Sequence, residues 1–367
     1  MRRSRNGYGG YRGRRTLHDI LKGIAVVLAV LVVLTLALLL WGQRFLVFTD
    51  RGPRLNLPGF SGGGETPPAA SGSISVVIDE SGGGEPAGGE DAGESAEPDA
   101  MLALELPLQA VLDGTAAGLL SEAGANALVL EMKSQDGTLA WASSQELAAA
   151  LGVSTGTEEV NEAIRQWNQG EVYTVARVCC FRDNTVPYYR NSMALRAGNG
   201  NWKDELGLRW LHPGNEQSQI YLAQLCGELA ALGFDEILLE CAAFPTQGNL
   251  DRINWGDYAD PSRRAAAARD VLTACAQAVK SYGTLLSLRL DGQALDGAAS
   301  GLTPALLEEQ AGRLWTQAGQ GEEQLLSQLG EAGLSIQAER VVMLTGALDS
   351  NVKLSQAVLE LPPEEET

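Results

Sequence analysis

The stretch Gly233-Phe-Asp-Glu-Ile-Leu-Leu-Glu-Cys-Ala-Ala-Phe-Pro245 decides the fold that this sequence predicts. A glycine of the kind that ends helices precedes a short apolar run, which can be buried on both faces as in a parallel sheet. The run is too short for a helix, and Phe244-Pro245 and a glycine-containing loop follow it, so Glu240 is predicted at the carboxyl end of a strand. In α/β barrels that edge of the sheet holds the catalytic groups.

Strand-like and helix-like segments alternate from Met101 onward, which predicts βαβ units and a mainly parallel sheet. About seven strands are expected, at residues 102–106, 126–133, 172–178, 234–240, 284–290, 313–316 and 340–345. Helices are expected at residues 112–123, 157–168, 216–232, 262–282, 304–311 and 322–329. The predicted fold class is therefore α/β, a TIM (β/α)8-like barrel over residues 101–367 in which one element is missing or irregular.

The first hundred residues have a different character from the barrel segment. Residues 1–22 are Arg-rich and are predicted to form a disordered cytoplasmic tail, whereas residues 23–43 carry no charge. At about 1.5 Å per residue the uncharged stretch can span a hydrocarbon layer of roughly 30 Å, so one transmembrane helix through the lipid bilayer is expected. A cleavable signal peptide is the alternative. Residues 44–100 are rich in Gly, Pro and Glu and are predicted to be a disordered linker, in which residues 74–78 form either a docked strand or an apolar linker patch.

The distribution of charge sets the expected location and excludes some partners. Basic residues are denser before the apolar span than after it, which predicts a single-pass protein of the cell membrane with a cytoplasmic amino terminus and an extracytoplasmic domain. After Arg54 the chain holds 17 basic and 44 acidic residues, a net charge of −27. Such a surface repels nucleic acid, so no nucleic-acid partner is expected.

The cysteine pattern argues against a metal site. The five cysteines lie in apolar segments and show no Cys-x-x-Cys pair and no Cys/His spacing typical of zinc sites. They are therefore predicted to be buried thiols, and no metal or cofactor is expected.

Several of these segments resemble a known family. They are Asn126-Ala-Leu-Val-Leu-Glu-Met-Lys133 with Gly137, Ala176-Arg177 with Phe181 and Asp183, Trp202-x-Asp204 with Trp210-Leu-His-Pro213, and Gly233-Phe-Asp-Glu-Ile237 with Phe244-Pro245. In order and spacing, from about residue 102 to 260, they resemble the putative glycosyl hydrolase family of bacterial surface proteins, a domain of unknown function. The resemblance implies a TIM barrel and a carbohydrate substrate. Where the family has Asp-Tyr-Val-Arg-Phe-Pro, this chain has Glu240-Cys-Ala-Ala-Phe-Pro245, so Ala243 replaces an arginine.

Hydrolysis of a glycosidic bond generally needs two carboxyl groups, about 5–5.5 Å apart for retention or about 6.5–9.5 Å apart for inversion. The candidates are Glu240 as one member and Asp183, Glu131 or Asp291 as the other, all predicted at one barrel edge. Two cations accompany them. In the functional interpretation Arg177 orients or charges the nucleophilic carboxylate and Lys133 holds a neighbour ionised. In the alternative, Glu131 with Lys133 and Arg177 with Glu240 are ion pairs that close strand ends.

The remaining candidates lie in the long loops 184–215 and 246–261. Trp202, Trp210 and Trp255 are candidates for stacking on sugar rings, and the alternative is that the first two fasten the loop to the barrel. His212 is a candidate binding residue, and the alternative is a local hydrogen-bonding role.

Two functions remain open from the sequence. The first is a membrane-anchored extracytoplasmic glycoside hydrolase that acts on polysaccharide or peptidoglycan through a carboxylate pair. The second is a catalytically inactive barrel that binds glycan or a surface partner.

Overall fold

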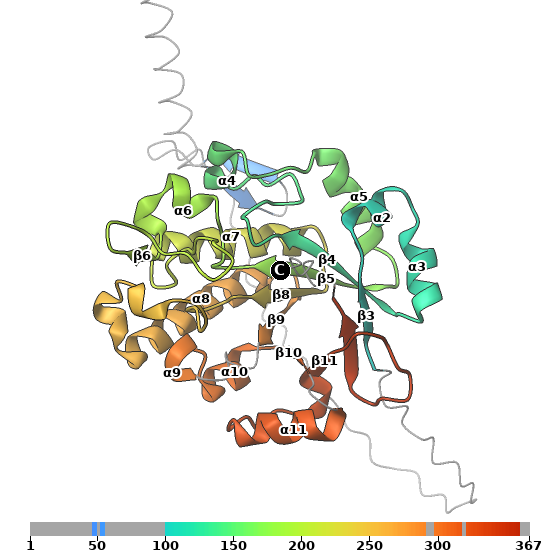
Figure 1. Cartoon of the computed structure of the whole chain (residues 1–367). Helices are drawn as coiled ribbons and strands as arrows, with labels where there is room; N and C mark the ends of the chain where they lie inside the picture. Colours follow the sequence, from blue (N-terminus) through green and yellow to red (C-terminus); the bar gives the residue numbers. More distant parts are fainter. Residues whose placement is uncertain (1–45, 50–51, 56–99, 291–296, 318–320, 360–367) are drawn as a thin grey trace, which may run out of the picture. The chain divides into compact units, whose positions relative to one another are not determined.

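The computed structural model of the chain describes residues 46–49, 52–55, 100–290, 297–317 and 321–359 (Figure 1). The chain divides after Glu90, and its two parts are described separately. In the first part, β1 (Leu46–Thr49) and β2 (Gly52–Leu55) form an antiparallel pair, so the predicted linker contains one short hairpin.

Several predictions for the amino-terminal region fall outside the described residues. These are the basic tail 1–22, the apolar span 23–43 and the patch 74–78. Among the helices that the structure describes, none is sufficiently long and apolar to cross a bilayer.

Eight parallel strands form a closed barrel in the second part of the chain, in the order β10-β11-β12-β3-β4-β5-β8-β9. The strands are β3 (Leu102–Glu105), β4 (Ala127–Lys133), β5 (Tyr173–Cys179), β8 (Glu236–Glu240), β9 (Leu285–Leu290), β10 (Leu314–Gln317), β11 (Val341–Leu344) and β12 (Ser355–Val358). This is the architecture of a TIM barrel, as the sequence predicts.

All eight strands of the barrel are present, so of the two expected departures, a missing or an irregular element, no strand is missing. Strand β12 pairs in parallel with both β11 and β3 and closes the cylinder. Its four residues, Ser-Gln-Ala-Val, carry little apolar character, and no helix separates β12 from β11. A strand this short takes its conformation from its two neighbours, and its own sequence gives no clear signal.

The helices lie outside the strands (Figure 1). They are α2 (Leu108–Leu112), α3 (Ala116–Ala123), α4 (Glu146–Leu151), α5 (Glu158–Asn168), α6 (Val186–Tyr189), α7 (Glu216–Ala231), α8 (Pro261–Lys280), α9 (Gly297–Ser300), α10 (Pro304–Gln310) and α11 (Glu322–Glu331). The predicted helix 112–123 is divided at Gly114, which has a positive φ of 77°. Helix α4 was not predicted.

The long loop after β5 is structured. It contains α6, the 3-10 turn η1 (Asn191–Met193) and a small hairpin of β6 (Arg196–Ala197) and β7 (Gly200–Asn201). The loop after β8 contains the 3-10 turns η2 (Leu250–Arg252) and η3 (Gly256–Ala259), and η4 (Ala338–Arg340) precedes β11.

Because side chains point alternately outward and inward along each strand, the barrel has two separate hydrophobic cores. Outward side chains pack under the helices, while a smaller cluster that includes Val129, Val175, Leu238 and Trp315 fills the barrel interior. Because successive side chains of a strand point to opposite faces, the residue two positions after each of these inward residues also faces inward, nearer the carboxyl rim. Polar side chains at those positions therefore converge. Four of the five cysteines are buried as predicted, and Cys241 is half-buried.

A buried polar cluster lies at the amino end of the barrel. Glu236 is fully buried and pairs with Arg313, while Trp315 Nε1 donates to its Oε1 atom at 2.8 Å and the Tyr173 hydroxyl donates to Oε2 at 3.0 Å. A buried carboxylate is tolerated only when its lone pairs are used in this way.

Replacing Glu236 by Gln should destabilise the barrel by about 3 kcal/mol, because it leaves Arg313 without its charged partner in a largely buried site. Urea denaturation measures the change. The control is Glu122→Gln on the exposed face of α3, for which the expected change is within about 0.5 kcal/mol. Equal effects of the two substitutions would contradict the structural role of Glu236.

Candidate active site at the carboxyl rim

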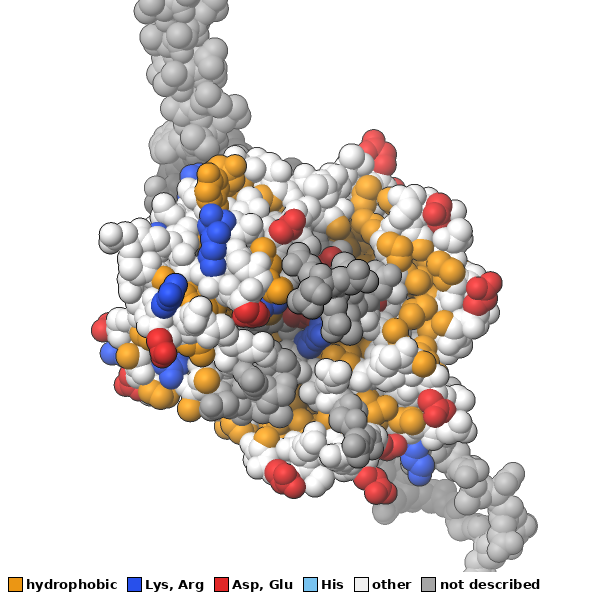
Figure 2. Space-filling view, in the orientation of Figure 1, with side chains coloured by type: hydrophobic (Ala, Val, Ile, Leu, Met, Phe, Trp, Pro, Cys, Tyr) orange, Lys and Arg blue, Asp and Glu red, His pale blue; other side chains and the backbone are white. Residues whose placement is uncertain are grey.

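One arginine gathers three carboxylates from three different strands. Arg177, near the end of β5, is only 8% exposed. Its Nε and Nη2 atoms lie 2.8 and 2.7 Å from Glu105 Oε1, Nη2 lies 3.0 Å from Glu131 Oε1, and Nη1 lies 3.1 Å from Glu240 Oε2. The ends of β3, β4 and β8 therefore meet at one guanidinium. Figure 2 shows acidic and basic side chains close together near the centre of the face viewed.

Glu240 is held by a second cation. Arg289, near the end of β9, donates through Nη1 to Glu240 Oε1, so each carboxylate oxygen accepts a hydrogen bond from a different guanidinium. Such charge-assisted bonds are made by an ionised carboxylate. Both cations come from the strands that neighbour β8.

The other two carboxyl groups are biased toward the protonated form. Burial raises the pKa of Glu105 from 4.5 to about 7, although Arg177 acts in the opposite direction. Burial likewise raises the pKa of Glu131 despite Arg177, and the charge of Glu240 adds to the increase. Carboxyl groups whose environments separate their pKa values are the usual basis of acid and base roles in one site.

The three carboxyl groups differ in access to solvent. The side chain of Glu131 is 43% exposed, that of Glu240 is 11% exposed, and that of Glu105 is 4% exposed. Glu131 is thus the most accessible of the three, whereas Glu240 and Glu105 are both largely buried. Glu105 and Glu131 oxygens share the Nη2 atom, so they can be no farther apart than the sum of their distances to it.

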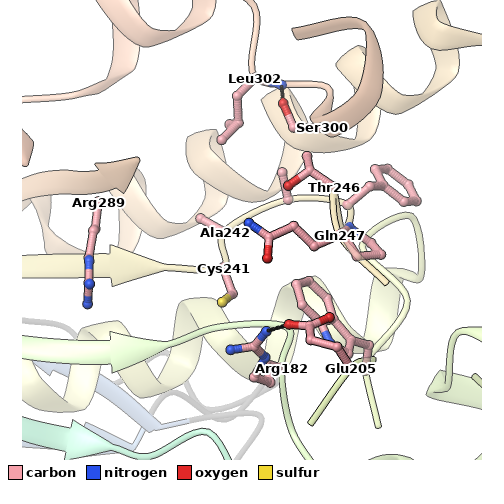
Figure 3. Close-up of a pocket in the computed structure, with 13 residues that line it drawn as sticks. Arg182, Glu205, Cys241, Ala242, Thr246, Gln247, Arg289, Ser300 and Leu302 are labelled. Atoms are coloured by element: carbon pink, nitrogen blue, oxygen red, sulfur yellow. Dashed lines mark hydrogen bonds and ion pairs between the residues drawn. The ribbon is translucent and has the colours of Figure 1, made fainter. Parts of the chain in front are cut away.

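A small cavity of about 90 Å³ adjoins Glu240 (Figure 3). It is lined by Arg289 and Arg182 and by the turn that follows β8, including Gln247. Cys241 begins this turn with a φ of 47°, a conformation that non-glycine residues adopt rarely. The sharp turn directs the chain away from the rim immediately after Glu240.

Asp183 and Lys133 form a separate buried ion pair. Lys133 Nζ lies 3.0 Å from Asp183 Oδ2, both side chains are fully buried, and Lys133 also donates to the Cys179 carbonyl at 2.8 Å. Burial alone would lower the pKa of Lys133, but the charge and hydrogen bond of Asp183 together with the neighbouring Cys179 and Cys180 outweigh it, and the pKa is raised. Asp183 Oδ1 accepts from the N–H groups of Thr185 and Val186, which places it at the start of the long loop.

Lys133 and Asp183 pair with each other and do not contact the cluster around Arg177. The alternative in which Lys133 pairs with Glu131 is not observed, because Lys133 pairs with Asp183 and the register shifts between Glu131 and Lys133 on β4. The predicted contact of Arg177 with Glu240 is present. Asp291 lies outside the described residues.

Trp202 and Trp210 fasten the long loop, as the alternative interpretation holds. Their side chains are 1% and 5% exposed, and their rings meet edge to face with centroids 6.1 Å apart. Trp202 Nε1 donates to the Asn249 carbonyl at 3.0 Å, and Trp210 Nε1 donates to Asp204 Oδ2 at 2.9 Å. Neither ring offers a free face on which a sugar could stack.

His212 and Trp255 belong to a local aromatic group. His212 Nδ1 accepts from the Gly214 N–H at 3.0 Å, its ring meets Phe244 and Tyr258, and burial lowers its pKa. Trp255 lies against Phe244 and beneath the Arg264 guanidinium. These contacts agree with the local hydrogen-bonding interpretation of His212.

Two residues of the cluster were not among the candidates. Glu105 ends the first barrel strand, Leu102-Ala-Leu-Glu105, and so carries the same signal that identified Glu240. Arg289 is the only basic residue of Leu285–Leu290, and a cation inside an apolar strand is itself a signal of a buried partner.

Comparison with known proteins agrees with the fold. The profile of the family described as "Putative glycosyl hydrolase domain" matches residues 112–300, and the chain belongs to this family. It is a glycosyl hydrolase-like domain on a TIM barrel. A comparison with curated protein sequences gives no match.

Three solved structures illustrate the structural similarity. The glycoside hydrolase domain of PgaB (BpsB) from Bordetella bronchiseptica is 13% identical with a TM-score of 0.51, and the match covers 71% of this chain and 93% of that one. A hypothetical protein from Ruminiclostridium thermocellum is 23% identical with a TM-score of 0.43, and the match covers 50% of this chain and 96% of that protein. A GH20 exo-β-N-acetylglucosaminidase from Vibrio harveyi is 11% identical with a TM-score of 0.47, covering 67% of this chain and 41% of the enzyme. At these identities the similarity concerns the fold.

Gly137 should be needed for the Lys133–Asp183 pair. It has a φ of 93°, and a Cβ atom there would lie 2.4 Å from Asp183 Oδ1, which two backbone N–H groups hold in place. Gly137→Ala should cost about 3 kcal/mol in unfolding free energy, measured by denaturant titration. The matched control is Gly124→Ala, where φ is also positive but nothing lies within 4 Å, with an expected cost of about 1 kcal/mol. Equal costs would show that contact with Asp183 is unimportant.

Glu105 should make stability depend on pH. The pKa of Glu105 is ordinarily 4.5 and is about 7 in the folded protein. Its contribution to the unfolding free energy is therefore fully present below pH 4.5 and is lost as the pH rises through 7. Unfolding free energy should therefore fall by about 3 kcal/mol on its account over that interval. Denaturation at several pH values should show a weaker decline for Glu105→Gln and an unchanged decline for Glu122→Gln. An undiminished decline in Glu105→Gln would refute the assignment.

Proposed function

We propose that the chain is a membrane-anchored, extracytoplasmic glycoside hydrolase in which Glu131 and Glu240 form the carboxylate pair. The observation that carries this proposal is the cluster around Arg177, where a half-exposed carboxyl group with a raised pKa lies beside a carboxylate bound by two guanidinium groups. Both acids are attached to one guanidinium, so they lie within the roughly 10 Å over which a pair can act.

The surroundings of Glu131 and Glu240 indicate which of the two acts as the acid and which as the nucleophile or base. Glu131 is protonated more readily than an ordinary glutamate and is the more exposed, so it is the general acid that protonates the oxygen of the leaving sugar. Glu240 is bound between Arg177 and Arg289, and as the second carboxylate it either attacks the anomeric carbon or removes a proton from the attacking water. Glu105 is too deeply buried for either role.

Sequence features support the location and the substrate class. The uncharged span 23–43 and the basic residues before it favour an anchored protein with an exported domain. The family and the barrel favour a carbohydrate, and an exported barrel encounters cell-wall polysaccharide or peptidoglycan.

A glycan-binding barrel without turnover is the second candidate. Both oxygens of Glu240 are engaged by arginines, and the adjoining cavity holds only about 90 Å³. An enzyme would have to release at least one of these contacts when substrate binds.

Release of reducing ends from peptidoglycan and common polysaccharides by the full chain tests the proposal. Glu240→Gln and Glu131→Gln should each lower the rate by roughly a hundredfold or more, whereas Glu122→Gln should have no effect. The rate should fall as pH rises through the raised pKa of Glu131, because the acid loses its proton, and Glu131→Gln should remove this alkaline decline.

The outcomes separate the two candidates. Full activity in Glu240→Gln would exclude the carboxylate pair. Retention of a glycan by the unaltered chain without any turnover would instead support the binding function.

A further inference from the structure

The loop between β5 and α7 carries a hollow in which positive charge is not balanced. The hollow measures about 350 Å³ and is lined by Arg196, Lys203 and Arg209 together with Tyr188, Asn191 and Asn201, and we call it the basic hollow. Figure 2 shows Lys and Arg side chains over the region of α6 and β6 on the face viewed. This loop leaves the same rim that holds the Arg177 cluster.

Neutral oxygens hold the two arginines of the basic hollow. Arg196 donates through Nη1 to Asn201 Oδ1 and through Nη2 to the Asn199 carbonyl at 3.1 Å. Arg209 donates through Nη1 to Asn184 Oδ1 at 2.8 Å, and its guanidinium lies 4.8 Å from the centre of the Tyr188 ring. The guanidinium groups are thus positioned without being neutralised.

The contrast with other arginines of the barrel is clear. Arg177, Arg182, Arg289 and Arg313 each contact at least one carboxylate. Within the described ranges, no carboxylate forms an ion pair with the three cations of the basic hollow. Three uncompensated cations in one small hollow are unusual in a domain with so large an excess of acidic residues, and they create a local site for an anion.

The backbone under the basic hollow is fixed. Asn254 donates through its N–H to the Arg196 carbonyl at 2.7 Å and through Nδ2 to the Gly198 carbonyl at 3.2 Å, which ties the β6–β7 hairpin to the loop after β8. Trp202, directly after β7, is buried and bonded to the same loop. The two arginines therefore have a preformed arrangement, which lowers the cost of binding.

We propose that the basic hollow binds a carboxylate or phosphate group carried by a short glycan. Guanidinium groups bind either anion through paired N–H donors, and the side-chain amide of Asn191, which also lines the hollow, suits a sugar hydroxyl. An extended polyanion is disfavoured because the domain as a whole carries a large excess of acidic residues, which would repel its remaining charges. This site does not depend on hydrolysis at Glu240.

Calorimetric titration of the full chain with two matched pairs of probes tests the inference. Trigalacturonate is compared with neutral maltotriose for the carboxylate, and glucose 6-phosphate with glucose for the phosphate. At least one anionic probe should bind more tightly than its neutral match, and the probe that does so identifies the anion.

Lys203→Gln is the decisive variant, because the exposed Lys203 side chain makes no hydrogen bond or ion pair with the part of the chain that the structure describes. It should weaken binding of the anionic probe roughly fivefold. Arg263→Gln, an exposed arginine on α8 with the same change in charge, should leave affinity unchanged. Glu240→Gln should also leave it unchanged, so failure of the hydrolase proposal would not affect this result.

Three results would overturn the proposal. They are the absence of any preference for the anionic probes, equal weakening by Lys203→Gln and Arg263→Gln, and loss of binding in Glu240→Gln, which would place the anion at the Arg177 cluster instead.

Discussion

The bonds between one buried guanidinium and three glutamates are the interaction on which the candidate site depends. Arg177 draws Glu105, Glu131 and Glu240 together from strands β3, β4 and β8. Three carboxylates around one cation would repel one another if all were ionised, and burial makes that repulsion costly. Two features of the site reduce this repulsion. Arg289 supplies a second cation to Glu240, and the pKa values of Glu105 and Glu131 rise.

Buried ionic groups serve different purposes along the barrel. At the amino end, the oxygens of Glu236 are used by Arg313, Tyr173 and Trp315, so this cluster is closed and structural. Lys133 and Asp183 are equally closed at the start of the long loop. At the carboxyl rim, Glu131 remains 43% exposed. Of these three clusters of described residues, the one at the carboxyl rim combines buried charge with access for a ligand, which is why chemistry is assigned there.

In the long loop after β5, some residues pack against the barrel and others face the solvent. Its tryptophans point inward and hold the loop against the barrel, so aromatic content does not imply a sugar-stacking platform here. What the loop presents outward is a set of cations, of which amide and carbonyl oxygens hold Arg196 and Arg209. The packing of the two tryptophans against the barrel therefore determines where on the surface the cations of the basic hollow lie.

The sequence alone determined the barrel class, seven of the eight strands, the family, and the placement of Glu240 and Arg177 at strand ends, because alternation and strand–helix order are local properties. The partners of those residues came only from the tertiary structure. Glu105 lies 72 positions from Arg177 along the chain and reaches it because of barrel closure and register. A register shift on β4 separates Lys133 from Glu131, and β12 exists as a strand because β11 and β3 leave a gap for it. Such long-range geometry depends on how strands pair, and a local pattern of residues does not specify it.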